Sequence, residues 1–282
     1  MVFRRLWLVP TLTVAFLLAG MFSGYIIGVA KNHLPVFLPF ISDGGSMPPE
    51  GCVFAQLLNM TAFLVVLTIY IRQTVEFYEH RLNWKRTVWH QMSLALMYMG
   101  FASALGLTLV ANFPESELPL VHMIGAVLTF FSMVIYGWGQ VIMGYSMVPR
   151  MVPLFVVHLR MLLIVVATLC LVLHELAVTL HVFVASGAGA PPGGWYRVRR
   201  LGKDSPFYLN YMIATGSEWV MALTMAAFIL TFVAELRYTY AHAPRVVFRR
   251  DADDNPALGT SEGCKSYGSC EPIQDERPRF DV

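Results

Sequence analysis

Long apolar stretches separated by short polar ones dominate this sequence. Six of the stretches hold about 20 or more mainly apolar residues, the length at which a helix crosses the hydrocarbon core of a bilayer. Runs of this length are typical of membrane-spanning helices, whereas shorter runs build the cores of soluble domains. The pattern therefore predicts an all-α, polytopic membrane protein, a six-helix transmembrane bundle with spans over residues 6–29, 52–71, 92–111, 121–145, 161–185 and 208–234.

The composition supports this assignment. The 282 residues are 56% hydrophobic and only 13% charged, which is about half the charge of an average soluble domain. The formal net charge of +2 is too small for a protein that binds nucleic acid through counterion release. The 4 cysteines are too few and too scattered for a disulfide framework or a zinc cluster. Soluble enzymes, disordered proteins and nucleic-acid binders are thereby excluded.

Lysines and arginines indicate the orientation of the bundle. Most of the 20 fall before the first predicted span, in loops on the same side as the N-terminus, or in the tail. Because cytoplasmic loops are the ones enriched in these residues, we expect both termini in the cytosol. The first apolar run follows Arg4 and Arg5 but is about twice as long as the apolar core of a typical signal peptide, so we interpret it as a retained signal-anchor helix. Residues 1–240 form the predicted transmembrane domain.

The end of the chain has a different character. Residues 241–282 begin basic, continue acidic and polar, and lack apolar periodicity, so we predict a disordered cytosolic tail. Arg245, Arg249 and Arg250, together with Arg72 at the end of the second span, are candidate contacts to the anionic lipids of the inner leaflet. The alternative is that they only contribute to the charge asymmetry that orients the bundle.

Carboxylates within the apolar runs are candidates for function. An ionisable side chain in hydrocarbon costs at least about 2.5–3.5 kcal/mol, so it faces the bundle interior and commonly has a role. Glu175 and Glu218 each lie about ten residues from the outer end of their predicted span, which is about 15 Å deep. They could share a proton, bind a cation or hold a lipid headgroup, or simply form a hydrogen bond between helices. The candidate lipid- or partner-binding cluster on this side comprises Asp43, Glu50, Asn59, Asn112, His122, Glu175, Glu218 and Trp219.

The first outer loop and the first span carry further local signals. Asp43-Gly44 is typical of a tight turn, and Pro-Pro-Glu before Cys52 is typical of a helix start. The same loop could instead fold over the outer polar cluster. Gly20, Gly24 and Gly28 lie four residues apart, a spacing that predicts a helix-packing face.

Motifs for catalysis or cofactors are missing from the sequence. His174 and His181 are seven residues apart, which does not match the spacing of a zinc-binding helix. The sequence contains no nucleophile elbow, P-loop or dinucleotide fingerprint. We therefore expect a protein that is not an enzyme, with no catalytic residues, no metal and no cofactor.

Several short motifs, taken in order, resemble the FRAG/DRAM/SFK membrane family, and the resemblance extends over all six predicted spans. Within the family the chain is most similar to the DRAM (damage-regulated autophagy modulator) branch, which its tail from Cys270 to Arg279 also resembles. The motifs are Ile41-Ser42-Asp43, Pro48-Pro49-Glu50, Cys52-Val53-Phe54, Leu58-Asn59, Ile69-Tyr70-Ile71-Arg72, Val110-Ala111-Asn112-Phe113, His122 with Gly125–Phe130, Glu218-Trp219 and Leu230-Thr231.

The resemblance implies a six-helix regulator of the lysosomal or late-endosomal membrane that promotes autophagy without being an enzyme. It also implies cytosolic trafficking or autophagy proteins as partners of the tail, besides membrane lipids. The chain ends in Phe280-Asp281-Val282 where a dileucine sorting signal is expected, so the plasma membrane is also possible. Two alternatives stay open: a plasma-membrane lipid organiser that supports phosphoinositide kinase recruitment, and a channel or transporter that uses Glu175, Glu218 and Asn59.

Overall fold

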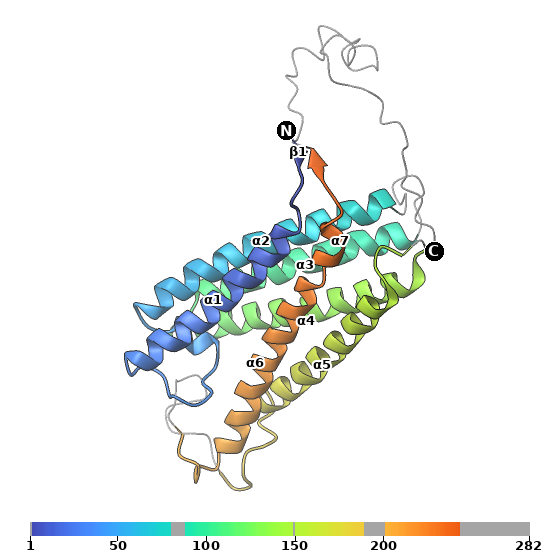
Figure 1. The fold of residues 1–282 in the computed structure, drawn as a ribbon. Helices are drawn as coiled ribbons and strands as arrows, with labels where there is room; N and C mark the ends of the chain where they lie inside the picture. The colour runs from blue at the N-terminus through green and yellow to red at the C-terminus, as the bar shows by residue number, and fades with distance from the viewer. Residues whose placement is uncertain (1, 80–87, 149, 189–200, 243–282) are drawn as a thin grey trace, which may run out of the picture. The chain divides into compact units, whose positions relative to one another are not determined.

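The structure is a computed structural model, and it describes residues 2–79, 88–148, 150–188 and 201–242 (Figure 1). Within these residues six helices are long and apolar enough to cross a membrane, which confirms the all-α, six-span prediction. They are α1 (Leu8–Ala30), α2 (Glu50–Glu79), α3 (Val88–Asn112), α4 (Pro119–Ser146), α5 (Leu154–Val178) and α6 (Tyr208–Leu230). A short 3-10 helix, η1 (Ser42–Gly45), precedes α2, and α7 (Val233–Leu236) follows α6.

The predicted bounds of the fifth span are wrong. The prediction was 161–185, but α5 starts directly after Pro153 and ends at Val178. The predicted span began after Arg160, whereas the structure buries this arginine inside the helix bundle. The second span shows the same effect, since α2 continues past Ile71 and includes the buried residue Arg72. An arginine at the edge of an apolar run was interpreted as the end of the span, but a charge does not end a helix when an opposite charge pairs with it.

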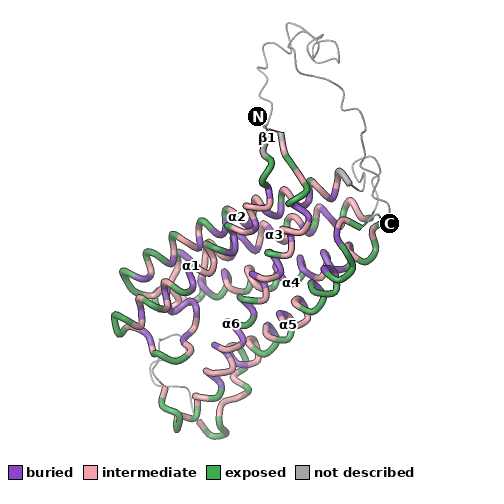
Figure 2. The backbone as a smooth tube through the Cα atoms, viewed as in Figure 1, coloured by how far each residue is buried: buried purple, intermediate pink, exposed green. Residues whose placement is uncertain are grey.

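The six long helices pack in chain order. Each contacts the next along the sequence, and α1 also contacts α6, so the series closes into a ring (Figure 1). The core between them is apolar and includes Tyr136, Ile164 and Met221. Exposed positions on the helices also carry large apolar side chains, such as Ile26 and Leu162, and exposed and buried positions alternate along each helix (Figure 2). An apolar surface around an apolar core is what a bilayer requires of a bundle.

Glycines allow close contacts between the helices. A Cβ atom at Gly106 of α3 would lie 2.5 Å from the backbone nitrogen of Thr129 in α4. In the predicted packing face of α1, Gly20 meets Leu58 of α2, as expected for a contact between helices. Gly24 and Gly28 instead meet Gly44 and Leu34 of the following loop. The stripe therefore packs against one helix and one loop.

The bundle has two distinct ends. At the loop end, α1 ends and α2 and α6 begin; at the terminal end, α1 begins and α6 ends (Figure 1). Two-residue strands β1 (Val2–Phe3) and β2 (Ala241–His242) pair antiparallel, and they belong to a unit separate from the helical one, which spans Arg4–Tyr240. The start of the predicted disordered tail is thus a strand, and the remainder, residues 243–282 with Arg245, Arg249 and Arg250, lies outside the described residues.

Candidate functional site

The loop of residues 31–49, which we call the first loop, is held at the loop end of the bundle by two neighbouring residues of α6. The backbone N–H of Ile41 donates to Oε2 of Glu218 at 2.8 Å. The indole Nε1 of Trp219 donates to the carbonyl oxygen of Pro39, also at 2.8 Å. We call these two hydrogen bonds the loop anchor. Glu218 is only 7% exposed, so its carboxyl group is used inside the protein and not on the surface.

Asp43 lies in η1 within the same loop and is also buried. Its Oδ2 accepts the backbone N–H of Phe40 at 3.2 Å, which closes a local turn. Burial, assisted by the negative charge of Glu115, raises the pKa of Asp43 from 3.8 to about 7, although the bond from Phe40 opposes the shift. Burial raises the pKa of Glu115 as well. The loop end therefore contains carboxyl groups that bind protons more readily than ordinary surface acids.

Glu50 fixes the other end of the first loop. It is the first residue of α2, where a carboxylate complements the helix dipole, and the predicted helix start is confirmed. Glu50 is completely buried, and its Oε1 pairs with Nδ1 of the partly exposed His33. The pair joins the beginning of the first loop to the beginning of α2.

Small residues let the first loop lie against the helices. A Cβ at Gly44 would lie 3.1 Å from Cα of Gly24 in α1, and one at Gly51 of α2 would lie 2.6 Å from the carbonyl oxygen of Gly45. A Cβ at Gly45 would lie 2.9 Å from Cδ1 of Phe54 in α2. Gly44 and Gly45, which follow Asp43, therefore allow the loop backbone to lie close to the helices in addition to forming the turn. The segment begins a helix, as predicted, and the loop before it is also bound by Glu218 and Trp219 of α6.

Asn59, Asn112 and His122 lie at the same end but make separate contacts. The amide groups of Asn59 and Asn112 bind each other reciprocally, each at 3.0 Å, and so join α2 to α3. Nδ1 of His122 lies 2.7 Å from the carbonyl oxygen of Phe113, to which it donates, and fixes the start of α4. These bonds are local links between consecutive helices.

A cavity of about 110 Å³ lies beneath the first loop. Its walls are mostly apolar and include Met21 and Phe54, while Ser42, His122 and Glu218 supply polar groups. The structure therefore brings His122 and Glu218 to one cavity.

Glu175 is not part of this arrangement, contrary to the sequence-based prediction. Because α5 ends at Val178, Glu175 lies in the last turn of the helix and not ten residues inside a span. It is partly exposed, and its Oε2 accepts the hydroxyl of Thr179 at 2.8 Å. Its depth was misjudged because the predicted fifth span was displaced along the chain.

Comparison with known proteins identifies the family. The sequence profile of the Frag1/DRAM/Sfk1/Cwh43P N-terminal domain matches residues 5–239, the whole helical unit. The chain belongs to the Frag1/DRAM/Sfk1 family. This confirms the resemblance found in the sequence motifs. No solved structure matches the chain.

Relatives of this Frag1/DRAM/Sfk1 protein include named autophagy modulators. It is 32% identical over 233 residues to DNA damage-regulated autophagy modulator protein 2 of Rattus norvegicus, covering 81% of this chain and 82% of the relative. It is 31% identical over 235 residues to DNA damage-regulated autophagy modulator protein 1 of Homo sapiens, covering 83% and 92%. It is 29% identical over 178 residues to the modulator of macroautophagy TMEM150B of Bos taurus, covering 62% and 72%.

The terminal end of this family member carries an ionic network that the sequence analysis missed. Arg72 pairs with Glu76 at 2.8 Å and with Glu235 at 2.9 Å, and Arg160 pairs with Glu235 at 2.9 Å. All four side chains are buried, and the guanidinium of Arg160 lies 4.9 Å from the ring centre of Phe232. The network joins α2, α5 and α7 with balanced charge.

The role predicted for Arg72 as an inner-leaflet lipid contact is therefore wrong. Arg72 is only 4% exposed, and both of its ion pairs are internal. The four-residue spacing of Arg72 and Glu76 was a usable signal, because residues at this spacing are neighbours on a helix. Glu235 lies 75 positions beyond Arg160, and no local pattern connects them.

Metal ligation has no obvious place in the described part of the chain. No three His, Cys, Asp or Glu side chains gather among those residues as a metal ion would need. The chemistry that the loop end can perform is hydrogen bonding and proton uptake at Asp43.

Proposed function

We propose that this protein is a non-enzymatic, DRAM-like modulator of autophagy in the lysosomal or late-endosomal membrane. The family profile covers the entire helical unit, and several relatives that match most of the chain are named autophagy modulators. The proposal extends that role to this chain, with both termini in the cytosol.

The loop anchor is the observation that carries the proposal. Glu218 and Trp219 are polar side chains placed ten or more residues into a span, and the structure uses both to hold backbone groups of the first loop. The carboxyl group of Glu218 and the indole of Trp219 both bind backbone groups of the protein itself. This supports a role in binding and positioning and not in catalysis. The bundle would then hold the first loop in a fixed conformation at one face of the membrane and carry the tail at the other face.

Asp43 adds support for an acidic compartment. With cytosolic termini, the first loop faces the organelle lumen. The pKa of Asp43, raised to about 7 by burial, means that this side chain becomes protonated where the lumen is acidic. Protonation removes a buried charge, so an acidic lumen favours the docked loop.

Cells that lack the protein provide the test. They would be complemented with the wild type, with Trp219→Phe to weaken the loop anchor, and with Glu175→Gln as a matched control from the same end of the bundle. We expect wild type and control to restore autophagic flux, measured as cargo turnover with and without lysosomal inhibition, and Trp219→Phe to restore less. The proposal fails if deletion leaves flux unchanged, or if the endogenous protein resides at the plasma membrane.

A second candidate function, a channel or transporter, is favoured by one observation, the cavity of about 110 Å³ that Glu218 and His122 share. Ion and proton flux through purified protein in liposomes separates it from the modulator. The modulator predicts no flux above that of empty liposomes, and a flux that Glu218→Gln abolishes would favour the transporter.

A further inference from the structure

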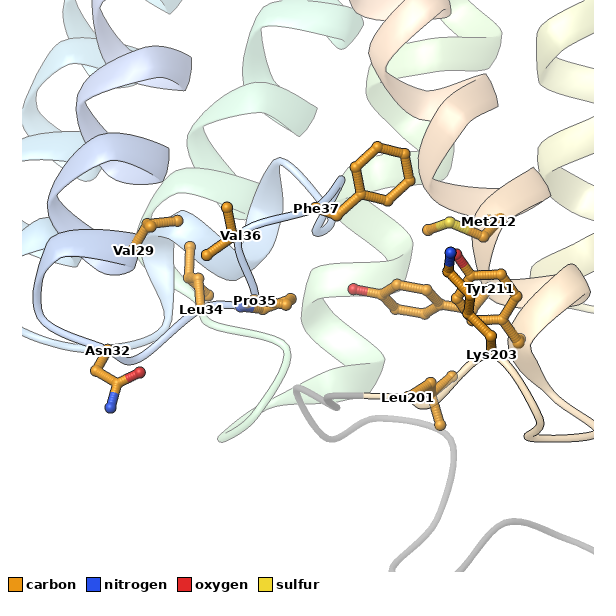
Figure 3. A pocket seen from close by; sticks show the side chains of 11 residues that line it. Val29, Asn32, Leu34, Pro35, Val36, Phe37, Leu201, Lys203, Tyr211 and Met212 are labelled. Atoms are coloured by element: carbon orange, nitrogen blue, oxygen red, sulfur yellow. The ribbon is translucent and has the colours of Figure 1, made fainter.

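A second, larger pocket lies beside the loop anchor. Its volume is about 500 Å³, within the range of roughly 300–1,000 Å³ that small-molecule sites occupy. One wall comes from the end of α1 and the first loop, and the other from the start of α6 and the segment before it (Figure 3). The pocket is lined by Val29, Asn32, Leu34, Pro35, Val36, Phe37, Leu201, Lys203, Tyr208, Tyr211 and Met212.

The lining combines an apolar surface with one positive charge. Most of the residues are aliphatic or aromatic, and Asn32 and the two tyrosines add polar atoms. Lys203 is the one cation among the described residues that line the pocket, and no described carboxylate lines it. Figure 3 shows the side chain of Lys203 extending toward Met212. A ligand that fits this lining has an apolar body and an anionic group.

The depth of the pocket in the membrane narrows the choice of ligand. Val29 lies in the last turn of α1, and Tyr208 begins α6, so the pocket is level with the ends of two spans. Tyrosines favour this interfacial depth. The first-loop side chains Val36 and Phe37 are 75% and 69% exposed. Apolar loop residues this exposed are favourable at the boundary of headgroups and hydrocarbon, and costly in water.

We propose that this pocket binds an anionic phospholipid from the leaflet at the loop end of the bundle. The phosphate pairs with Lys203, and the first part of an acyl chain lies along Phe37 and Met212. A soluble anion would leave the apolar walls in contact with water, whereas a sterol would leave Lys203 without an anionic partner. A lipid satisfies both parts of the lining and reaches the site from within the membrane.

The lipid site goes beyond the proposed role in autophagy and does not depend on it. The two are nevertheless connected by structure, because the first loop supplies both Phe37 of the pocket and Ile41 of the loop anchor. Lipid in the pocket therefore contacts the segment that Glu218 holds in place. Binding is measured on purified protein, so its failure is distinguishable from a failure of autophagic modulation in cells.

Photolabelling of the full-length protein tests the site. The protein is placed in phosphatidylcholine nanodiscs with a minor fraction of phosphatidylglycerol that carries a diazirine on one acyl chain, and labelled peptides are mapped. We expect labelling at residues 34–37 and 208–212. Lys203→Met should lower it about fivefold, the equivalent of about 1 kcal/mol for one cation near an anionic lipid. Lys203→Arg should retain it.

Two further variants complete the design. Lys31→Met is the matched control, because Lys31 is an exposed cation at the end of α1 that does not line the pocket; it should label like the wild type. Met212→Trp fills the pocket and should abolish labelling. Phe37→Ser alters an exposed side chain and replaces Met212→Trp if that variant fails to fold.

Several results would overturn the assignment. Equal losses in Lys203→Met and Lys31→Met would indicate general surface charge, and uniform labelling of all lipid-facing helices would indicate bulk lipid. Competition by inorganic phosphate would indicate a soluble anion site. Unchanged labelling in Lys203→Met, or equal labelling by a photoreactive sterol, would show that the pocket does not select an anionic headgroup.

Discussion

Replacing Glu218 with alanine probes the loop anchor directly. The change removes the acceptor of the Ile41 N–H, a bond that is buried and 2.8 Å long. Leaving a buried donor unsatisfied costs about 1–3 kcal/mol. The shortened side chain also enlarges the adjacent cavity of about 110 Å³, and each Å³ that does not collapse adds about 24 cal/mol. Together we expect a loss of roughly 2–4 kcal/mol.

The expected loss is measurable as a change in melting temperature. For a protein of this size 1 kcal/mol corresponds to about 2–4 °C, so Glu218→Ala should melt at least about 4 °C lower in detergent. Glu218→Gln keeps a side-chain acceptor of nearly the same shape and should lose less than about 1 kcal/mol. Proteolysis should detect a more accessible first loop in Glu218→Ala only.

Glu175→Gln is the control for these variants. Glu175 has the same side chain and lies at the same end of the bundle, but it is partly exposed and bonds only locally to Thr179. Its replacement should stay within about 0.5 kcal/mol of the wild type. If Glu218→Ala melts like Glu175→Gln and its first loop stays protected, the anchor contributes no stability and the reasoning is refuted.

Three further predictions concern other parts of the molecule. Because the pKa of Asp43 is raised from 3.8 to about 7, the native state retains a proton that the unfolded state loses, so stability should fall as pH rises across that window, and Asp43→Asn should flatten the pH profile of melting. Gly106→Ala places a Cβ 2.5 Å from a backbone nitrogen of α4, whereas Gly202 has open space; only the first alanine variant should lower the melting temperature. Glu235→Gln leaves two buried arginines without a shared anionic partner and should cost about 3–5 kcal/mol. The loss is measurable as a lower yield of folded protein on size exclusion, and a normal yield would contradict the importance of the network.

The number of spans and the fold class were determined by the sequence alone. Each span is a long, mainly apolar run, and in a bilayer such a run satisfies its own backbone hydrogen bonds only as a helix. The carboxylate Glu218 was also recognised from the sequence, because a charge within an apolar run is conspicuous without any knowledge of its partner. The family resemblance also came from local motifs.

The partners of these residues were decided by tertiary structure. Ile41 and Glu218 are 177 positions apart, and a backbone N–H donor carries no side-chain signature that could reveal the bond. Arg160 and Glu235 are also far apart in the sequence, so no local pattern reveals their ion pair. This pair allows α5 to continue through a charge at which the predicted span stopped. That error displaced the fifth span and placed Glu175 too deep. The sequence shows which charges lie within apolar spans, where an unpaired charge is costly. Only the packed bundle determines which opposite charges and backbone groups offset that cost.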